Sequence, residues 1–271
     1  MDNLKTYCLC IHDELLEKVK KLNYIPVGLG ENIFNKNWLR DNTGDNINHK
    51  NKFYGEYTFH YWLWKNKLNL IQDEDWFGFC AYRRFWVQDK NNIDIKNTND
   101  FLSKPSPDWE DHDVILGQDI FMDNWSLMKL IKHGRKSLIN EPKFFFKKNR
   151  NLKFHFDSFH GFGNLDKAIN FLEENDREDF KNFMISKNSY NRGNMFLCNS
   201  KEILIKFYES IFPWLERCEK VFGFDMQNKS YGLIRIYAFL AERYLAFWFN
   251  KYTKVKIWPI TFYDINKNEP Q

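Results

Sequence analysis

The amino-acid sequence predicts a single α/β domain with a doubly wound, mostly parallel sheet flanked by helices, and with a helical C-terminal part. Short apolar runs of strand length alternate along the chain with longer segments in which apolar residues recur at helical spacing. The run at residues 76–82 is continuously apolar or small, which is typical of a strand that helices cover on both faces. No internal repeat or low-complexity linker divides the chain.

The order of these patterns defines the expected elements. We expect strands at residues 6–11, 24–29, 76–82, 113–117, 194–198 and 255–260. We expect helices at residues 14–22, 54–67, 124–132 with Asp123 as N-cap, 165–174, 177–186 and 233–250, and a long helix that Ser200 caps and Pro213 kinks. Residues 143–153 are basic and aromatic, with no clear period.

Composition excludes several classes of protein. Of the 271 residues, 43% are hydrophobic and 18% aromatic, which indicates a sizeable core and excludes disorder. The 40 lysines and arginines are spread among 36 acidic residues, and the net charge is only +4. We therefore expect no nucleic-acid partner. The sequence contains neither a signal-peptide pattern nor an apolar run long enough to span a membrane, which predicts a cytoplasmic protein. Five cysteines, an odd number, are expected to be reduced core thiols.

Two arginines directly follow the buried strand of residues 76–82. Arg83 and Arg84, after Tyr82, would lie at its carboxyl end, where open α/β sheets bind ligands. A guanidinium pair there suggests an anion, and guanidinium groups bind phosphate oxygens bidentately. The alternative is that both arginines form structural ion pairs.

The loop after the second strand combines acidic, amide and small residues. Carboxylates suit the hydroxyl groups of a ribose or a sugar, and glycine allows close approach of the backbone to a ligand. The alternative is ordinary turn chemistry. The candidate residues for contact with a nucleoside or a sugar are Asp41, Asn42, Thr43, Gly44, Asp45 and Asn46.

An aromatic-rich helix is expected next. Glu56, His60 and Trp64 share one of its faces. His60 and Trp64 are candidates for sugar contact, and the alternative is that both are core residues.

Five stretches together resemble a known bacterial family. They are DNTGDNI (41–47), YGEYTFHYWLWKN (54–66), GFCAYRRFW (78–86), NMFLCNSKE (194–202) and AERYLAFWF (241–249), and they resemble the family catalogued as domain of unknown function 4422. The resemblance runs from about residue 25 to residue 263. Ala81 stands where the family usually has histidine, so any role of that histidine is open here.

The resemblance implies a fold and an activity. It implies a GT-A-like glycosyltransferase of capsular or exopolysaccharide biosynthesis, with residues 1–120 binding a nucleotide sugar and residues 121–271 forming an acceptor-binding, helical half. A hexosyl donor, with a hexofuranosyl such as galactofuranosyl as one option, would react with a lipid-linked or polysaccharide acceptor at the inner face of the cytoplasmic membrane. Peripheral membrane association would follow. The alternative is a non-catalytic protein of this fold that binds nucleotide sugars or glycans.

An inverting transferase needs a general base, usually a carboxylate. Asp157, between His155 and His160 in HFDSFHGFG, is expected on a mobile loop; an ordinary loop acid is the alternative. Glu242 lies in a largely apolar helix, and Arg243 is expected to be a poor partner for it because adjacent helical residues point about 100° apart. The alternative for Glu242 is a buried pair with Arg235 or another base.

The NRGN segment (191–194) could contact sugar hydroxyls, and the alternative is a simple turn. Five further residues, two of them in this segment, are candidates for contact with the sugar or the acceptor. They are His155, His160, Asn191, Asn194 and Arg243.

No divalent metal is expected as a cofactor, since Arg83 and Arg84 would neutralise a UDP-sugar diphosphate. The literal Asp-x-Asp at residues 73–75 precedes its strand and would lie at the wrong edge of the sheet. Asp119 and Asp123 remain possible ligands.

Overall fold

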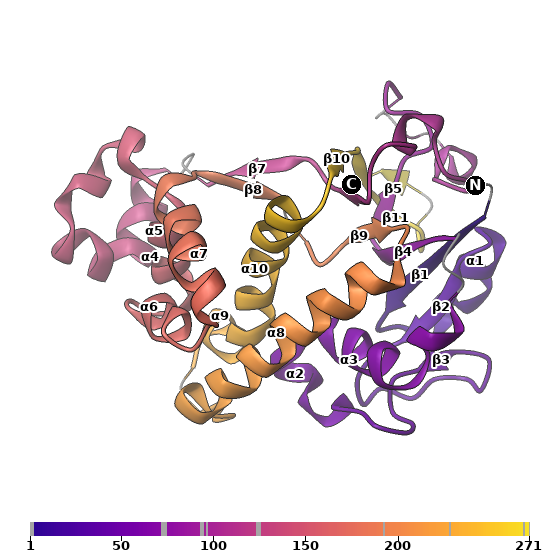
Figure 1. The fold of residues 1–271 in the computed structure, drawn as a ribbon, viewed down its shortest axis with the longest axis horizontal. Coiled ribbons are helices and arrows are strands. Elements are labelled where there is room, and N and C mark those ends of the chain that lie inside the picture. Colours follow the sequence, from indigo (N-terminus) through magenta and orange to yellow (C-terminus); the bar gives the residue numbers. More distant parts are fainter. Residues whose placement is uncertain are drawn as a thin grey trace. The chain divides into compact units, whose positions relative to one another are not determined.

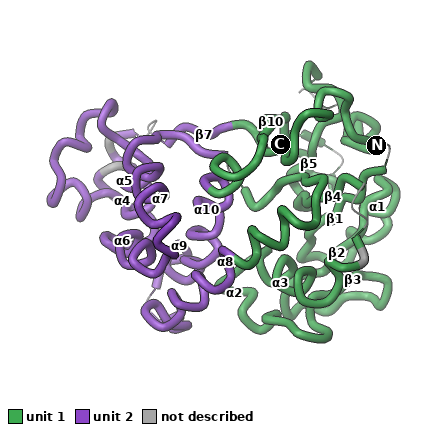
Figure 2. Tube along the Cα trace, in the orientation of Figure 1, with its two compact units in different colours: residues 1–118, 193–209, 248–271 green, residues 119–192, 210–247 purple. Residues whose placement is uncertain are grey.

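The protein is described by a computed structural model, which covers residues 3–71, 75–92, 95, 97–122, 126–191, 193–227, 229–267 and 269–270. Figure 1 shows its helices and strands, and Figure 2 shows two compact units. Unit 1 comprises residues 1–118, 193–209 and 248–271, and unit 2 comprises residues 119–192 and 210–247. This division differs from the expected halves because the chain returns twice to unit 1 after residue 120.

A mostly parallel sheet forms the centre of unit 1, as the sequence predicts. Its strand order is β10-β6-β9-β4-β1-β2-β3. β1, β2, β3 and β4 run parallel to one another, and β6 runs parallel to β10. β9 lies between β4 and β6 and is antiparallel to both. The strands are β1 (Leu4–Cys10), β2 (Ile25–Gly28), β3 (Leu39–Arg40), β4 (Trp76–Ala81), β6 (Val114–Leu116), β9 (Phe196–Cys198) and β10 (Val255–Ile257).

Three further strands extend this sheet beside the end of β4. β5 (Arg84–Trp86) is antiparallel to β4 and to β11 (Ile260–Asp264), which also pairs with β12 (Glu269–Pro270). The sequence did not predict these strands or β3, because each is short and all four carry a charged residue.

Helices cover unit 1 in short pieces. The expected helix at residues 54–67 is interrupted, because Gly55 adopts a positive φ of 57° and separates α2 from α3. The helical elements are η1 (Asp13–Leu15), α1 (Leu16–Lys21), η2 (Asn48–Lys50), α2 (Asn51–Tyr54), α3 (Tyr57–Asn66), η3 (Leu68–Leu70), η4 (Thr98–Asp100) and η5 (Pro107–Trp109).

The core of unit 1 lies on both faces of β4. Cys80 faces a cluster that includes Val19 of α1. Phe79, on the opposite face, packs against Phe59 and His60 of α3, with ring centroids 6.3 and 4.2 Å away. β4 is therefore buried on both sides, as its continuous apolar run predicts.

Unit 2 consists mainly of helices, with a two-stranded antiparallel ribbon formed by β7 (Asp119–Phe121) and β8 (Ser189–Asn191). α8 and α10 contribute to both units, and Pro213 lies inside α8. The helical elements are α4 (Leu127–Asn140), η6 (Pro142–Phe145), η7 (Lys147–Asn149), α5 (Leu152–His160), α6 (Asn164–Ile169), α7 (Glu174–Ser186), α8 (Lys201–Phe222), α9 (Tyr231–Ile234) and α10 (Ile236–Tyr252).

Two expected caps have different outcomes. Ser200 caps α8, since its hydroxyl accepts a hydrogen bond from the Ile203 amide at 3.3 Å. The expected helix at residues 124–132 begins instead at Leu127, where Ser126 accepts from the Lys129 amide. Asp123, the expected cap, lies outside the described residues.

All five cysteines, Cys8, Cys10, Cys80, Cys198 and Cys218, are buried free thiols.

Candidate functional site

The chain turns directly after β4. Tyr82 and Arg83 form the turn of a tight hairpin, in which Ala81 pairs with Arg84. The Arg83 guanidinium is exposed and lies 5.1 Å from the ring centroid of Tyr82. Arg84 is partly buried, and its guanidinium lies 5.3 Å from the ring centroid of Phe262 on β11. The two arginines are therefore in different environments.

Arg84 lies beside the segment that enters β9. A Cβ atom added to Gly193 would be 3.6 Å from Nη1 of Arg84, and Gly193 adopts a positive φ of 93°. Because β9 is antiparallel to β4, its amino end lies at the edge where β4 has its carboxyl end. Within the described part of the chain, no carboxylate forms an ion pair with Arg83 or Arg84. The charge of Arg83 nevertheless acts on the nearby Asp264 carboxyl, so the alternative interpretation stays open for Arg83.

Asn194 connects this edge to the start of α3. Its side-chain amide donates to Oε2 of Glu56 at 3.4 Å, and its Oδ1 is buried with no hydrogen-bond partner in the described structure. A buried amide oxygen without a partner costs free energy that a ligand hydroxyl could recover. The sequence pattern places Glu56 on one helical face with His60 but gives no signal of its contact with Asn194, so Glu56 is not among the predicted site residues.

A second polar cluster lies at the carboxyl end of β3. Asp41 is fully buried, and its Oδ1 accepts a hydrogen bond from Asn48 at 2.5 Å. Burial raises the pKa of Asp41, and hydrogen bonds from Thr58 and Asn48 oppose that shift. Asp41 follows β3 and Arg84 begins β5, which are four strand steps apart through β2, β1 and β4, about 19 Å at the usual strand spacing of about 4.8 Å.

The rest of the loop at residues 41–47 extends along α3, away from this edge. Trp62 donates through Nε1 to the Thr43 hydroxyl at 3.1 Å. Asn66, one turn further along the helix, accepts from the Asp45 amide at 3.1 Å and donates to the Asp45 carbonyl at 2.7 Å. Thr58, Trp62 and Asn66 have a spacing of four residues, so they form one stripe that the loop follows.

These contacts explain why the loop motif at residues 41–47 and the helix motif at residues 54–66 occur together. Gly44 has a positive φ of 59°, and a Cβ there would lie only 2.0 Å from Oδ1 of Asn66. Asn46 donates to the Gly44 carbonyl, and Asn42 is exposed. Of the six loop candidates, Asp41 alone is placed with the carboxyl-edge cluster, whereas Thr43, Gly44 and Asp45 bind the later turns of α3.

His60 and Trp64 are packing residues. His60 is fully buried, and its Nδ1 lies 2.7 Å from the Tyr208 hydroxyl. Burial lowers the pKa of His60 to about 3, so the imidazole is neutral at pH 7. Trp64 is partly buried and packs near Tyr208, with ring centroids 6.3 Å apart.

In unit 2, Glu242 forms an ion pair with Arg243. Nη1 of Arg243 donates to Oε2 of Glu242, which also accepts from the Tyr190 hydroxyl at 3.2 Å. The expectation that Arg243 would be a poor partner was wrong, because its long side chain reaches back around the helix to the carboxylate. Nη2 of Arg243 lies 3.3 Å from Nδ1 of His155, and burial and the charge of Arg243 lower the pKa of that imidazole. Glu242 is therefore the counter-ion of a buried arginine.

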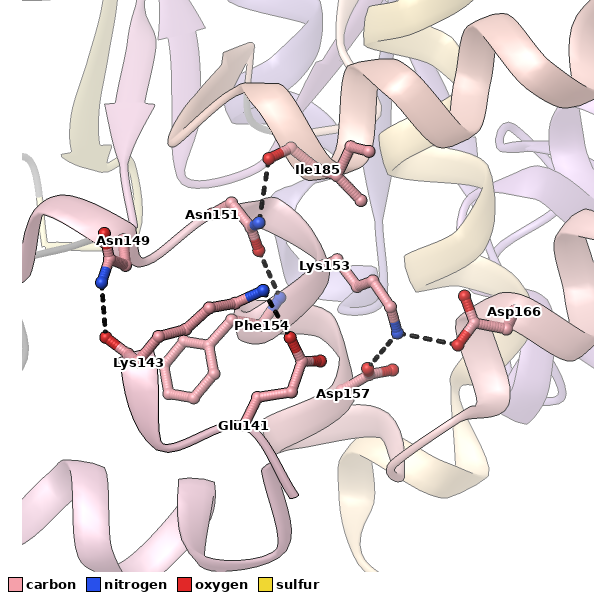
Figure 3. A network of polar contacts seen from close by, with 9 residues as sticks. All are labelled: Glu141, Lys143, Asn149, Asn151, Lys153, Phe154, Asp157, Asp166 and Ile185. Carbon is pink, nitrogen blue, oxygen red and sulfur yellow. Dashed lines mark hydrogen bonds and ion pairs between the residues drawn. The ribbon is translucent and has the colours of Figure 1, made fainter. Parts of the chain in front are cut away.

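Asp157 is helical, so the expectation of a mobile loop was wrong. It lies in α5, and the glycines that suggested a loop, Gly161 and Gly163, follow the end of that helix. Figure 3 shows Lys153 between Asp157 and Asp166, to which its ammonium donates at 2.6 and 2.8 Å. Burial raises the pKa of Asp157, and the bond from Lys153 opposes this shift. Lys153 therefore joins α5 to α6, and Asp157 is its ion-pair partner within α5.

His160 and Asn191 also have structural partners in unit 2. Nδ1 of His160 donates to the Gly232 carbonyl at 3.0 Å, and burial lowers its pKa to about 3. Asn191 of β8 donates to Oδ1 of Asp119 on β7 at 2.8 Å, and Ser189 donates to Oδ2 of the same carboxylate at 3.0 Å. Asp119 thus connects the two strands of the ribbon.

The loop along α3 gives a test of its structural role. The variant Asn66→Ala should lower the free energy of unfolding by about 1–3 kcal/mol, because it removes two hydrogen bonds to Asp45 and one to the Trp62 carbonyl. Gly44→Ala should also destabilise, through its clash with Asn66. In urea denaturation the double variant should be more stable than the sum of the two effects predicts, because removal of Asn66 relieves the clash.

The matched control is Asn69→Ala, at an exposed position three residues further on, which should change stability by less than about 0.5 kcal/mol. Strictly additive effects of the Gly44 and Asn66 substitutions would contradict the proposed contact.

Comparison with solved structures identifies a similar fold. The structure resembles the apo structure of the bifunctional glycosyltransferase WbbM, with a TM-score of 0.67 and 21% sequence identity. The similarity covers 96% of this chain and 45% of that chain, so this chain spans less than half of WbbM. At this identity the likeness concerns the fold. None of the described helices is both long and apolar enough to cross a membrane.

Sequence comparison gives the family. No curated protein matches the sequence. The model of a family described as a domain of unknown function, DUF4422, matches residues 7–254. This match includes the loop at residues 41–47, the hairpin that carries Arg84 and the strand that comes after Gly193. Because it extends over far more than half of the sequence, the chain belongs to the DUF4422 family.

Proposed function

We propose that this protein is a glycosyltransferase that moves a hexosyl group from a nucleotide diphosphate sugar to a surface polysaccharide. The observation that carries the proposal is Arg84, a partly buried cation at the ligand-binding edge of the sheet with no carboxylate partner among the described residues. A cation removed from water without a counter-ion costs free energy, which a diphosphate would recover. The similarity of the fold to a glycosyltransferase supports this class of reaction.

Polar groups next to Arg84 suit a sugar. Asn194 offers a buried amide oxygen, and Gly193 leaves the backbone open to close approach. Asp41, four strands away along the sheet, suits the ribose hydroxyls of the same donor. We propose Glu56, which contacts Asn194, as the general base for the acceptor hydroxyl. It is preferred to Glu242 and Asp157 because it contacts Asn194 beside Arg84 in unit 1, whereas those two carboxylates belong to unit 2.

The finer assignments rest on the family resemblance. We propose a UDP-sugar donor, with a hexofuranosyl group such as galactofuranosyl as the more specific option. We propose a capsular or lipid-linked acceptor at the cytoplasmic face of the membrane. A non-catalytic protein that binds nucleotide sugars is the second candidate, and the ion pairs of Glu242 and Asp157 favour it.

A thermal-shift screen followed by a transfer assay tests the function. A nucleotide diphosphate sugar should raise the melting temperature, because a ligand that binds only the folded state stabilises it. The same compound should then be hydrolysed or transferred to a glycan acceptor. Glu56→Gln should bind this donor as the wild type does and lose turnover by about 10²- to 10⁴-fold, the contribution of a general base. Binding without turnover in the wild type would favour the non-catalytic alternative, and the absence of any stabilising nucleotide sugar would refute both.

The two arginines should differ in their effect on donor affinity. Arg84→Ala should weaken nucleoside diphosphate binding by about 1.5–3 kcal/mol, the range for hydrogen bonds to charged groups. Arg83→Ala is the matched control, since its guanidinium is exposed at the hairpin turn, and it should cost less. Titration calorimetry with UDP measures both. Equal affinities of the Arg84 variant and the wild type would contradict the assignment of the phosphate site.

Transfer should not require a divalent metal, because we propose that Arg84 supplies the positive charge at the diphosphate. Asp75 lies at the amino end of β4 and accepts a hydrogen bond from Lys5 at 2.5 Å, and Asp119 holds the β7–β8 ribbon. Asp73, Glu74 and Asp123 lie outside the described residues. Turnover should therefore persist in excess EDTA. Activity that is lost in EDTA and returns with manganese or magnesium would overturn this proposal.

A further inference from the structure

Positive charge is concentrated in one segment of unit 2. Residues 126–150, which form α4, η6 and η7, contain eight lysines and arginines and one glutamate, so their net charge is +7. The whole chain has a net charge of +4, so the remaining residues carry −3. We call the exposed surface of this segment the basic face. The even spread of charge that the composition suggested does not hold for this segment.

The exposed side of α4 carries apolar and basic side chains next to each other. Met128 is 83% exposed and Ile139 is 68% exposed, and both lie on one stripe of the helix. Lys132 and Lys136 are exposed on the neighbouring stripe. On the opposite side, Leu138 packs with Phe144 and Phe154 in a small core. The exposed apolar residues are therefore additional to those that hold α4 in place.

Two phenylalanines extend from the turn between η6 and η7. Phe145 is 51% exposed and Phe146 is 65% exposed. This turn is held from inside, because the buried Arg150 donates to the Phe144 and Phe145 carbonyls, both at 3.1 Å. Figure 3 shows that Asn149 also donates to the Lys143 carbonyl. The exposed rings thus belong to a well-anchored turn.

Several cations of the basic face have no counter-ion among the described residues. Lys143 pairs with Glu141 at 2.7 Å. Within the described ranges, no partner is found for the side-chain charges of four others, which are Lys132, Arg135, Lys136 and Lys148. Unpaired cations beside exposed aromatic and aliphatic side chains match a surface that is anionic and has an apolar interior.

We infer that the basic face docks on the surface of an anionic lipid bilayer. The lysines and arginines would attract acidic headgroups, and Phe145, Phe146 and Met128 would enter the boundary between headgroups and acyl chains. A nucleic-acid duplex, whose bases are already stacked, would use the charges but leave these exposed apolar side chains in water. The inference concerns a surface distinct from the Arg84 cluster and does not depend on the proposed transferase activity.

Vesicle flotation tests the proposal with the full chain. The protein should float with vesicles of phosphatidylcholine mixed with phosphatidylglycerol and should not float with vesicles of phosphatidylcholine alone. High salt should weaken binding, since it screens exposed charges. A short duplex oligonucleotide, tested in parallel, should bind much more weakly than the anionic vesicles.

Two double variants separate charge from insertion. Lys132→Glu with Lys136→Glu should lower the partition coefficient at least 25-fold, because each lysine near an anionic surface contributes about a factor of five. Phe145→Ser with Phe146→Ser should also lower it. Lys21→Glu with Lys36→Glu makes the same charge change at exposed positions of unit 1 and should bind as the wild type does. Unchanged melting temperatures confirm that each variant is folded.

The outcomes are decisive. Loss of binding in both test variants, with binding retained in the control, supports the proposal. Equal flotation with neutral and anionic vesicles, a charge variant that binds as well as the control, or a phenylalanine variant that binds as well as the wild type would each overturn it. Tight binding of the oligonucleotide without vesicle binding would assign the basic face to nucleic acid instead.

Discussion

The burial of β4 on both faces is the constraint on which unit 1 depends. Phe79 and Cys80 are fully buried on opposite faces of the sheet, between β1 and β9. An arginine in such a strand would lose its hydration without a counter-ion, at a cost of several kcal/mol. The chain therefore leaves the sheet at Tyr82 and Arg83 and returns as β5, which begins with Arg84 at the edge. The position of this cation follows from the packing of the strand before it.

The same strand also determines what lies beside Arg84. Gly78 allows the antiparallel β9 to approach, because a Cβ there would lie 2.3 Å from the Phe196 carbonyl oxygen. The antiparallel direction brings Gly193 and Asn194 to the carboxyl edge of β4. A parallel strand at this position would have placed them at the opposite edge. The partly buried arginine and its polar neighbours therefore depend on one glycine in the middle of the sheet.

The sequence predicted the features that arise from local patterns and missed those that arise from distant partners. Apolar runs identified β4 and the mostly parallel sheet, because burial on both faces leaves a continuous signature. The docking of the loop at residues 41–47 on Asn66 was not visible, because it depends on contacts between residues about twenty positions apart. Asp157 was assigned to a loop because two glycines follow it, although they mark the end of its helix. The pairing of Glu242 with Arg243 was not expected, because the Cβ atoms of adjacent helical residues point about 100° apart. The long, flexible arginine side chain nevertheless reaches the carboxylate.

Two arginines of this protein differ in whether the described structure supplies a counter-ion. Both pack on aromatic rings: Arg243 lies 4.5 Å from the ring centroid of Tyr190, and Arg84 lies 5.3 Å from that of Phe262. Arg243 is 2% exposed and has Glu242 as its counter-ion. Arg84 is only partly buried and has no such carboxylate in the described structure. Where the protein needs the charge for its own packing, it supplies the anion itself. In the transferase that we propose, Arg84 lies at the carboxyl edge of the sheet, and the anion that neutralises it arrives with the substrate.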